Sequence, residues 1–104
     1  MPIPGPDADV ARQLAQAGIV ATGSDTMPYE SAPGITRLEV HVELLPKAGI
    51  FIFEMLDLRE LASAGAKEFL FVALPLRIVG GSGSPINPVA ILPQPEPQLA
   101  QASG

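Results

Sequence analysis

Apolar and polar residues recur with a helical period near the start of the chain. Val10, Leu14 and Ala17 are spaced by four and three residues, which puts them on one face of a helix, and Ala11 and Ala15 widen that face. Asp7 precedes this stretch and can cap it, because its carboxylate can accept hydrogen bonds from the unpaired first-turn amides. Gly18 follows where a left-handed C-terminal cap is favoured. The pattern therefore predicts a helix from Asp7 to about Ala17.

Short apolar runs later in the chain predict strands at residues 19–21, 50–53, 68–74 and 89–92. The run at 50–53 has no polar alternation, which is typical of a strand buried on both faces. The run at 68–74 predicts a second core strand. Between these two runs, Asp57 and Glu60 have capping-box spacing and predict a short helix that Gly65 ends.

Residues 35–45 have an ambiguous pattern. Leu38, Val40 and Val42 alternate with charged or polar neighbours, and this period of two favours a strand with one solvent-facing side. Residues 1–6 are rich in proline and are expected to be irregular, residues 22–34 read as a loop, and residues 93–104 read as a disordered tail. The mixture of short helices and buried strands over 7–92 predicts one layered α/β domain.

Composition narrows the function classes. Apolar residues make up 47 % of the 104 residues, and charged residues 16 %, against about 25 % in a typical domain. We expect a buried sheet that another subunit partly covers. The apolar runs are too short to span a membrane, and the net charge of −5 argues against a nucleic-acid partner. No signal peptide is visible at the N-terminus, so a cytoplasmic location is expected.

Two residues are candidates for metal chemistry. Glu54 directly follows the run 50–53, and the carboxyl end of a buried strand is where ligands bind in open α/β sheets. Its carboxylate must be hydrated, paired or metal-bound, and a strand end emerging into water also explains it. His41 is the only histidine of the chain. It suits a metal site, or the role of a surface residue or of a hydrogen-bonded structural residue. The absence of cysteine excludes thiolate ligands.

Two loops carry weaker candidates. Asp25 follows the predicted strand 19–21 and fits either a catalytic role or a local Asx turn. The loop 80–84 (GGSGS) contains Ser82 and Ser84. It is rich in glycine, but it does not lie between a strand and a helix start, so a turn between strands explains it better than a phosphate site.

Several stretches together resemble the cyclase family of metal-dependent hydrolases, which includes kynurenine formamidases and isatin hydrolases. They are 18–26 (GIVATGSDT), 41–45 (HVELL) with 49–54 (GIFIFE), 57–62 (DLRELA), 68–85 (EFLFVALPLRIVGGSGSP) and 88–91 (PVAI). The pieces occur in the family's order over roughly residues 8–92, and they correspond to its C-terminal half.

The resemblance implies a swivelling β/β/α fold and hydrolysis of amide-type C–N bonds by a metal-activated water, on small molecules such as formylated aromatic amines and cyclic amides. It also implies that His41 and Glu54 are metal ligands. An imidazole nitrogen with a carboxylate suits zinc or manganese. Asp25, Ser82 and Ser84 would help to shape the substrate site.

The family's His-x-Gly-Thr-His-x-Asp motif, which supplies most of its metal ligands, does not occur in this sequence. A catalytic zinc normally has three protein ligands, so we expect this chain to be inactive alone. Three hypotheses follow. The chain is one subunit of a split enzyme, or a C-terminal fragment of a longer one, or a non-catalytic interaction or scaffolding protein that keeps the fold. The partners expected are a homo-oligomer or a chain that supplies the N-terminal half.

Overall fold

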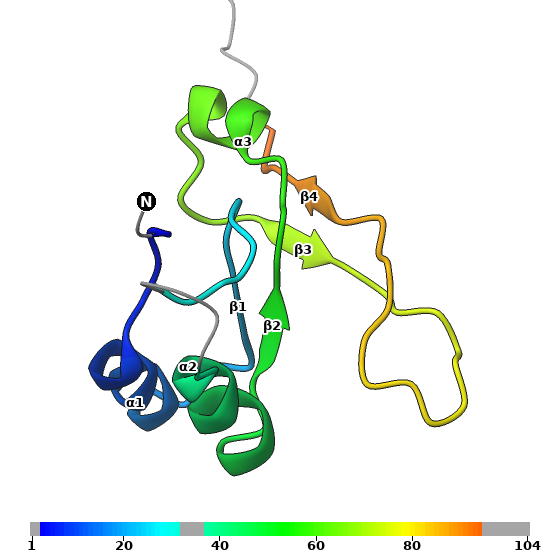
Figure 1. Cartoon of the computed structure of the whole chain (residues 1–104). Helices are drawn as coiled ribbons and strands as arrows, with labels where there is room; N and C mark the ends of the chain where they lie inside the picture. Colours follow the sequence, from blue (N-terminus) through cyan, green and yellow to red (C-terminus); the bar gives the residue numbers. More distant parts are fainter. Residues whose placement is uncertain (1–2, 32–36, 95–104) are drawn as a thin grey trace, which may run out of the picture. The chain divides into compact units, whose positions relative to one another are not determined.

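The chain combines short helices with two small sheets, a mixed α/β arrangement (Figure 1). The computed structural model describes residues 3–31 and 37–94. Contacts within the chain divide it into two units, Met1–Leu58 and Arg59–Gly104. The predicted tail falls mostly outside the described residues, and residues 4–6 are irregular, as expected.

The first helix is α1, Ala8–Gln16, and it confirms the sequence prediction. Asp7 is its N-cap, and its Oδ1 accepts a hydrogen bond of 2.9 Å from the backbone N–H of Val10. Gly18 follows with φ 72°, the left-handed conformation that glycine adopts without steric cost. The buried face is centred on Ala11 at 0 % exposure, whereas Val10 is 41 % exposed. The predicted apolar face is therefore confirmed for Ala11, Leu14 and Ala15, which lie in the core or pack against it, and it is wrong for Val10 and Ala17, which are exposed.

Strands β1, Ala21–Gly23, and β2, Phe51–Phe53, pair in parallel, with Ala21 opposite Phe51 and Gly23 opposite Phe53. β1 begins two residues later than predicted. The prediction that 50–53 is buried on both faces was wrong, because Phe51 is 63 % exposed while Ile50 is 3 % exposed. In a sheet of two strands only one face is covered here, so an apolar run does not by itself establish two-sided burial.

Residues 39–47 are helical, which corrects the strand predicted over 35–45. They form α2, Glu39–Val42, followed directly by a π-helical turn, η1, Glu43–Lys47. Val40 and Leu44 are spaced by four residues and are 1 % and 0 % exposed, so the buried period is that of a helix. A period-two pattern over so few residues does not separate a strand from a helix. Residues 35 and 36 of the predicted strand lie outside the described part.

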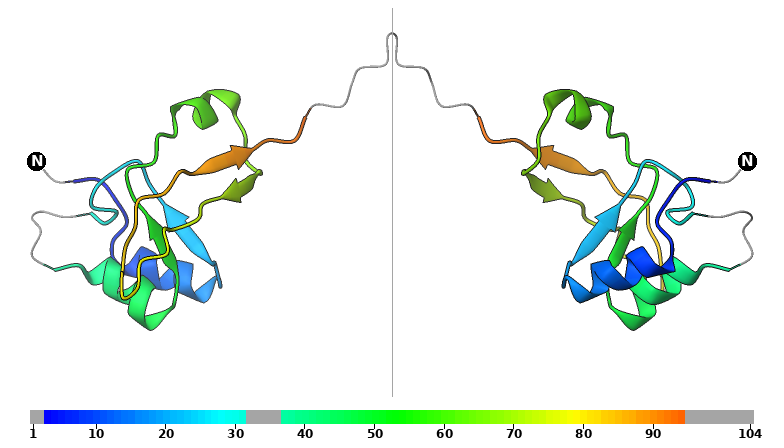
Figure 2. Two further views of the ribbon diagram at one scale, coloured as in Figure 1. Left: turned by 90° about the vertical axis from the view of Figure 1, so that its right-hand side faces the viewer. Right: turned by 90° about the vertical axis from the view of Figure 1, so that its left-hand side faces the viewer.

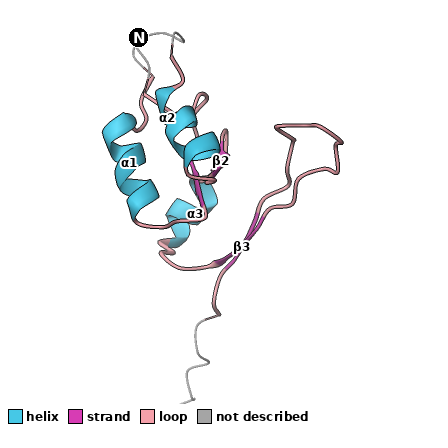
Figure 3. Ribbon diagram, turned by 90° about the horizontal axis from the view of Figure 1, so that it is seen from below, coloured by secondary structure: helices cyan, strands magenta, loops and turns pink. Residues whose placement is uncertain are grey.

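The core of the first unit lies where α1, α2 and η1 pack together and η1 meets β2 (Figure 3). Its buried apolar residues are Ala11, Tyr29, Val40, Leu44 and Ile50, and Leu14, Ala15, Ile19 and Ile52 pack against them. Tyr29 comes from the long loop after β1, and its hydroxyl lies 2.5 Å from Thr22 Oγ1. This loop is therefore fixed by burial, although the sequence marks it only as irregular.

The second unit contains α3, Arg59–Ala64, and a pair of antiparallel strands, β3, Leu70–Val72, and β4, Val89–Ile91 (Figure 2). The predicted helix is confirmed, and it ends before Gly65, whose φ is 63°. Both strands were predicted, and β3 is shorter than expected.

The prediction that 68–74 is a core strand was wrong, because no described residue of 59–94 is buried. Phe71 is 39 % and Leu74 76 % exposed. An isolated two-stranded hairpin is too thin to enclose its own apolar side chains.

Among residues 3–31 and 37–94, no helix has the length and apolar character needed to cross a membrane.

Candidate functional site

The carboxyl ends of β1 and β2 lie at the same edge of their sheet, because the two strands are parallel. The ladder continues beyond the strands, where the backbone N–H of Ser24 donates to the carbonyl of Phe53 over 3.0 Å. Glu54 is the next residue after β2. The sequence prediction that Glu54 follows a strand end is confirmed, and this edge is where open α/β sheets bind their ligands.

His41 and Glu54 lie side by side, although they come from α2 and from the end of β2. The distance from His41 Nε2 to Glu54 Oε1 is 3.2 Å, and the two side chains are 20 % and 29 % exposed. The same Glu54 oxygen accepts a hydrogen bond of 2.8 Å from the backbone N–H of Tyr29. The carboxylate is therefore held from one side by the loop after β1, while solvent still reaches the pair.

The other nitrogen of the His41 ring faces a second carboxylate. Nδ1 lies 2.5 Å from Glu30 Oε1. Glu30 is 3 % exposed, and it is the one buried charged residue among those described. Its oxygens also accept from the backbone N–H groups of Val40, at 3.3 Å, and His41, at 3.2 Å. These amides belong to the first turn of α2, where N–H groups lack helical partners.

Glu30 was missed by the sequence reasoning. It lies in a stretch interpreted as loop, eleven residues before His41, and no local periodicity links the two positions. The loop 22–34 contains two acidic residues, Asp25 and Glu30, and no local signal in the sequence marks Glu30 as the one that becomes buried. Every buried side-chain nitrogen and oxygen in the described part of the chain has a hydrogen-bond partner, so Glu30 is fully satisfied by these contacts.

The separation of His41 Nε2 and Glu54 Oε1 fits two ligands of one metal ion. Bond lengths of about 2.0–2.2 Å to zinc put neighbouring ligand atoms about 3.3–3.6 Å apart at the tetrahedral angle, and the observed distance of 3.2 Å lies just below this range. Glu30 does not join this set, because it contacts the opposite ring nitrogen. Within 3–31 and 37–94 no three His, Asp or Glu side chains converge as a metal site. The residues present therefore fit two ligands of a zinc or manganese ion.

The segment that carries Tyr29 and Glu30 is braced by the start of the chain. The backbone N–H of Ser31 donates to the carbonyl of Pro6 over 2.9 Å. A Cβ at Gly5 would lie 2.3 Å from the backbone oxygen of Tyr29 and 2.7 Å from the backbone carbon of Glu30. Gly5 thus permits a close backbone approach that any other residue would prevent.

Gly5→Ala is expected to destabilise the first unit by about 1–3 kcal/mol, the usual range for forcing extra atoms into a packed site. Tyr29 is the only tyrosine, and the chain has no tryptophan. Its fluorescence during urea unfolding therefore measures this unit alone. Ser31→Ala, at an exposed position in the same segment, serves as the control and should change stability by less than about 0.5 kcal/mol. Equal stability of the two variants would contradict the bracing role.

The weaker candidates are placed differently. Asp25 is exposed in the loop after β1, and no described residue makes a hydrogen bond or ion pair with it. Ser84 Oγ accepts from the backbone N–H of Leu76 over 2.8 Å and closes the loop between β3 and β4. Ser82 is exposed, and residues 80–84 lie between β3 and β4, which confirms the interpretation as a connection between strands. Both serines belong to the second unit, so their part in a substrate site stays a prediction.

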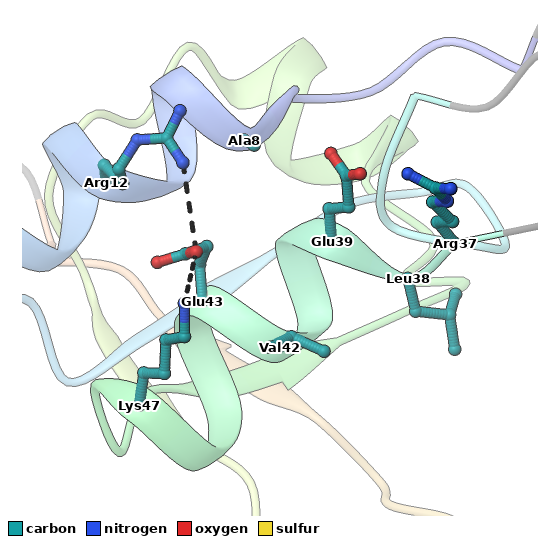
Figure 4. Close-up of a pocket in the computed structure, with 8 residues that line it drawn as sticks. All are labelled: Ala8, Arg12, Arg37, Leu38, Glu39, Val42, Glu43 and Lys47. Carbon is teal, nitrogen blue, oxygen red and sulfur yellow. Dashed lines mark hydrogen bonds and ion pairs between the residues drawn. The ribbon is translucent and has the colours of Figure 1, made fainter.

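An open groove of about 510 Å³ lies between α1 and the α2–η1 segment (Figure 4). Glu43 lies between Arg12, at 3.8 Å, and Lys47, at 2.7 Å. The hydrogen bond from Lys47 lowers the pKa of Glu43, and the hydrogen bond to Asp9 raises the pKa of Arg12. Neither His41 nor Glu54 lines this groove. It is a charged, solvated surface, separate from the His41–Glu54 pair.

Comparison with known proteins gives no match among family models, curated proteins or solved structures. The resemblance to the cyclase family is thus a prediction from the sequence motifs. Two residues singled out as ligands, thirteen positions apart in the sequence, lie 3.2 Å from each other at the carboxyl end of a strand pair.

Proposed function

We propose that this chain is the C-terminal half of a cyclase-type, metal-dependent hydrolase of amide C–N bonds, with His41 and Glu54 as metal ligands. The swivelling β/β/α fold belongs to this proposal. The single observation that supports it best is the 3.2 Å separation of His41 Nε2 and Glu54 Oε1. A metal ion at this pair would supply an activated water and polarise the substrate carbonyl.

The residues of this chain contribute binding and orientation. Glu54 offers one oxygen that the Tyr29 amide already orients, and His41 offers Nε2 from a ring fixed by Glu30. No second imidazole exists in the sequence, so a third ligand of the family's type must come from residues outside this chain. We therefore propose that activity requires a partner that carries the His-x-Gly-Thr-His-x-Asp motif, on a separate chain or on a longer form of this one.

The exposed apolar residues of the second unit support an assembly. Leu70, Leu74 and Leu76 are 60 % exposed or more. They lie within seven consecutive residues, 70–76, and clustered exposed apolar residues are typical of interaction sites. The same exposure also favours the alternative, a non-catalytic interaction or scaffolding protein, because such a protein needs the surface but not the metal pair. The two functions differ in whether the assembled protein needs His41 and Glu54 for metal binding and activity.

The function is tested by hydrolysis of an N-formyl aromatic amine in the presence of zinc or manganese. We expect no turnover by this chain alone, and turnover when a chain with the missing motif is added. Native mass spectrometry with metal analysis of the same samples should show a heteromer that carries metal. Turnover by the isolated chain would refute the proposal. A metal-free homo-oligomer, in samples supplied with metal and motif-bearing chain, would favour the scaffold instead.

A further inference from the structure

Glu30 is a buried carboxylate that the proposed metal site does not use as a ligand. It is 3 % exposed, yet it carries three contacts to a single turn of α2. Burying a carboxylate is costly unless its oxygens are hydrogen-bonded, so this position needs an explanation. Capping α2 accounts for two of the contacts, those to the amides of Val40 and His41. The third contact, to the ring of His41, is not required for capping.

The contact with the ring bears on which ring nitrogen of His41 carries a proton. Glu30 Oε1 is 2.5 Å from His41 Nδ1, and the same oxygen accepts from the His41 backbone N–H at 3.2 Å. Both Glu30 oxygens accept backbone amide hydrogens, which is the role of a carboxylate without a proton of its own, and this arrangement favours the ring as the donor in the contact between Nδ1 and Oε1. Once Nδ1 carries a proton, Nε2 is the nitrogen that can present a lone pair.

We propose that Glu30 is a positioning residue: it holds the Nδ1 proton of His41 and thereby aims the Nε2 lone pair at a metal ion beside Glu54. Metal-binding histidines generally donate the proton of their other nitrogen to a carboxylate or carbonyl, which fixes the tautomer and strengthens the ligand. Here the carboxylate also caps the helix that carries the histidine. One buried group therefore sets both the position of α2 and the orientation of the ring. This inference rests on the proposed function.

The protonation of the ring can be measured without any substitution. His41 is the only histidine of the chain, so a long-range ¹H–¹⁵N correlation spectrum of the untagged, metal-free protein reports on this ring alone. We expect Nδ1 to be protonated, with Nε2 either free or donating to Glu54. A ring protonated only at Nε2 would overturn the inference, because Glu30 would then be the donor. This measurement needs no metal, so it tests the inference about the ring even if the protein binds no metal.

Glu30→Gln then tests the effect on metal binding. The amide keeps the shape of the side chain but removes the charge that favours the Nδ1 proton. We expect zinc affinity, measured by competition with a chelator dye, to fall about 10- to 100-fold, the range for loss of an outer-shell partner of a ligand. Glu39→Gln, at an exposed carboxylate on the same helix, should leave the affinity unchanged.

Tyr29 fluorescence and far-UV circular dichroism of the Glu30→Gln protein show whether the first unit is still folded. A folded variant with the zinc affinity of the parent protein would overturn the inference. If the variant unfolds, its zinc affinity is not informative, and the ring spectrum of the parent protein decides whether the inference holds. If the parent protein binds no zinc even with a motif-bearing chain present, although Nδ1 is protonated, the proposed function fails and the inference about the ring stands.

Discussion

His41→Ala is expected to lower the zinc affinity of the protein by at least about a hundredfold, since the loss of an outer-shell partner alone costs about 10- to 100-fold. The substitution removes Nε2, one of the two ligand atoms that lie 3.2 Å apart. It also leaves Glu54 as a single carboxylate, which holds a divalent ion weakly in water. Equilibrium competition with a zinc-chelating dye, on the chain alone and with a motif-bearing partner, measures this loss.

A second variant separates metal binding from folding. His41→Ala also deprives the buried Glu30 carboxylate of its ring partner, so part of its effect can come from destabilisation. Glu54→Gln keeps an oxygen that can accept from the Tyr29 amide, as Glu54 does over 2.8 Å, and it should lose affinity while remaining folded. Glu39→Gln is again the matched control on α2. If His41→Ala and Glu54→Gln both bind zinc as the parent protein does, the metal is held elsewhere or not at all.

Leu44→Ala is expected to cost about 3 kcal/mol of unfolding free energy, within the 2–5 kcal/mol typical of large-to-small core substitutions. Leu44 is fully buried, at 0 % exposure, and belongs to a core of five residues in the first unit. A small core has few other contacts to compensate, and total stabilities are about 5–15 kcal/mol. Urea unfolding followed by Tyr29 fluorescence measures the change, because Tyr29 lies in the same core.

Leu45→Ala provides the control one residue away. Leu45 is 42 % exposed, so its truncation should cost less than about 1 kcal/mol. Val42 distinguishes the helical conformation of 39–47 from the predicted strand. In a strand with alternate burial, Val42 would share the buried face with Val40 and Leu44, whereas it is 47 % exposed in the helix. Equal costs for Leu44→Ala and Leu45→Ala would contradict the core, and a cost for Val42→Ala as large as that for Leu44→Ala would contradict the helix.

The core and the candidate site are connected through α2. Val40, at 1 % exposure, anchors the helix in the core, and His41 is its immediate neighbour. Glu30 and Tyr29 link the same helix and Glu54 to the loop after β1. Core variants such as Leu44→Ala can thus weaken metal binding without touching a ligand, which is why stability has to be measured beside affinity.

The sequence by itself determined the features that depend on neighbouring residues. Asp7 caps α1 because its carboxylate reaches an amide three positions away, and Gly18 and Gly65 end helices because glycine accepts a positive φ. Glu54 was correctly placed after a strand. The pairing of His41 with Glu54 was expected only through resemblance to a family, since no spacing rule brings a helix and a strand end together.

Tertiary structure decided the rest, because the responsible contacts join residues distant in sequence. Residues 39–47 are helical since Val40 and Leu44 pack into a core built with Ala11 and Ile50, and this burial outweighs a short alternating pattern. Glu30 became part of the site only when the loop after β1 folded against α2. The burial of apolar runs likewise depends on what covers them. Ile50 is enclosed at 3 % exposure, whereas Leu74 in an equally apolar run remains 76 % exposed.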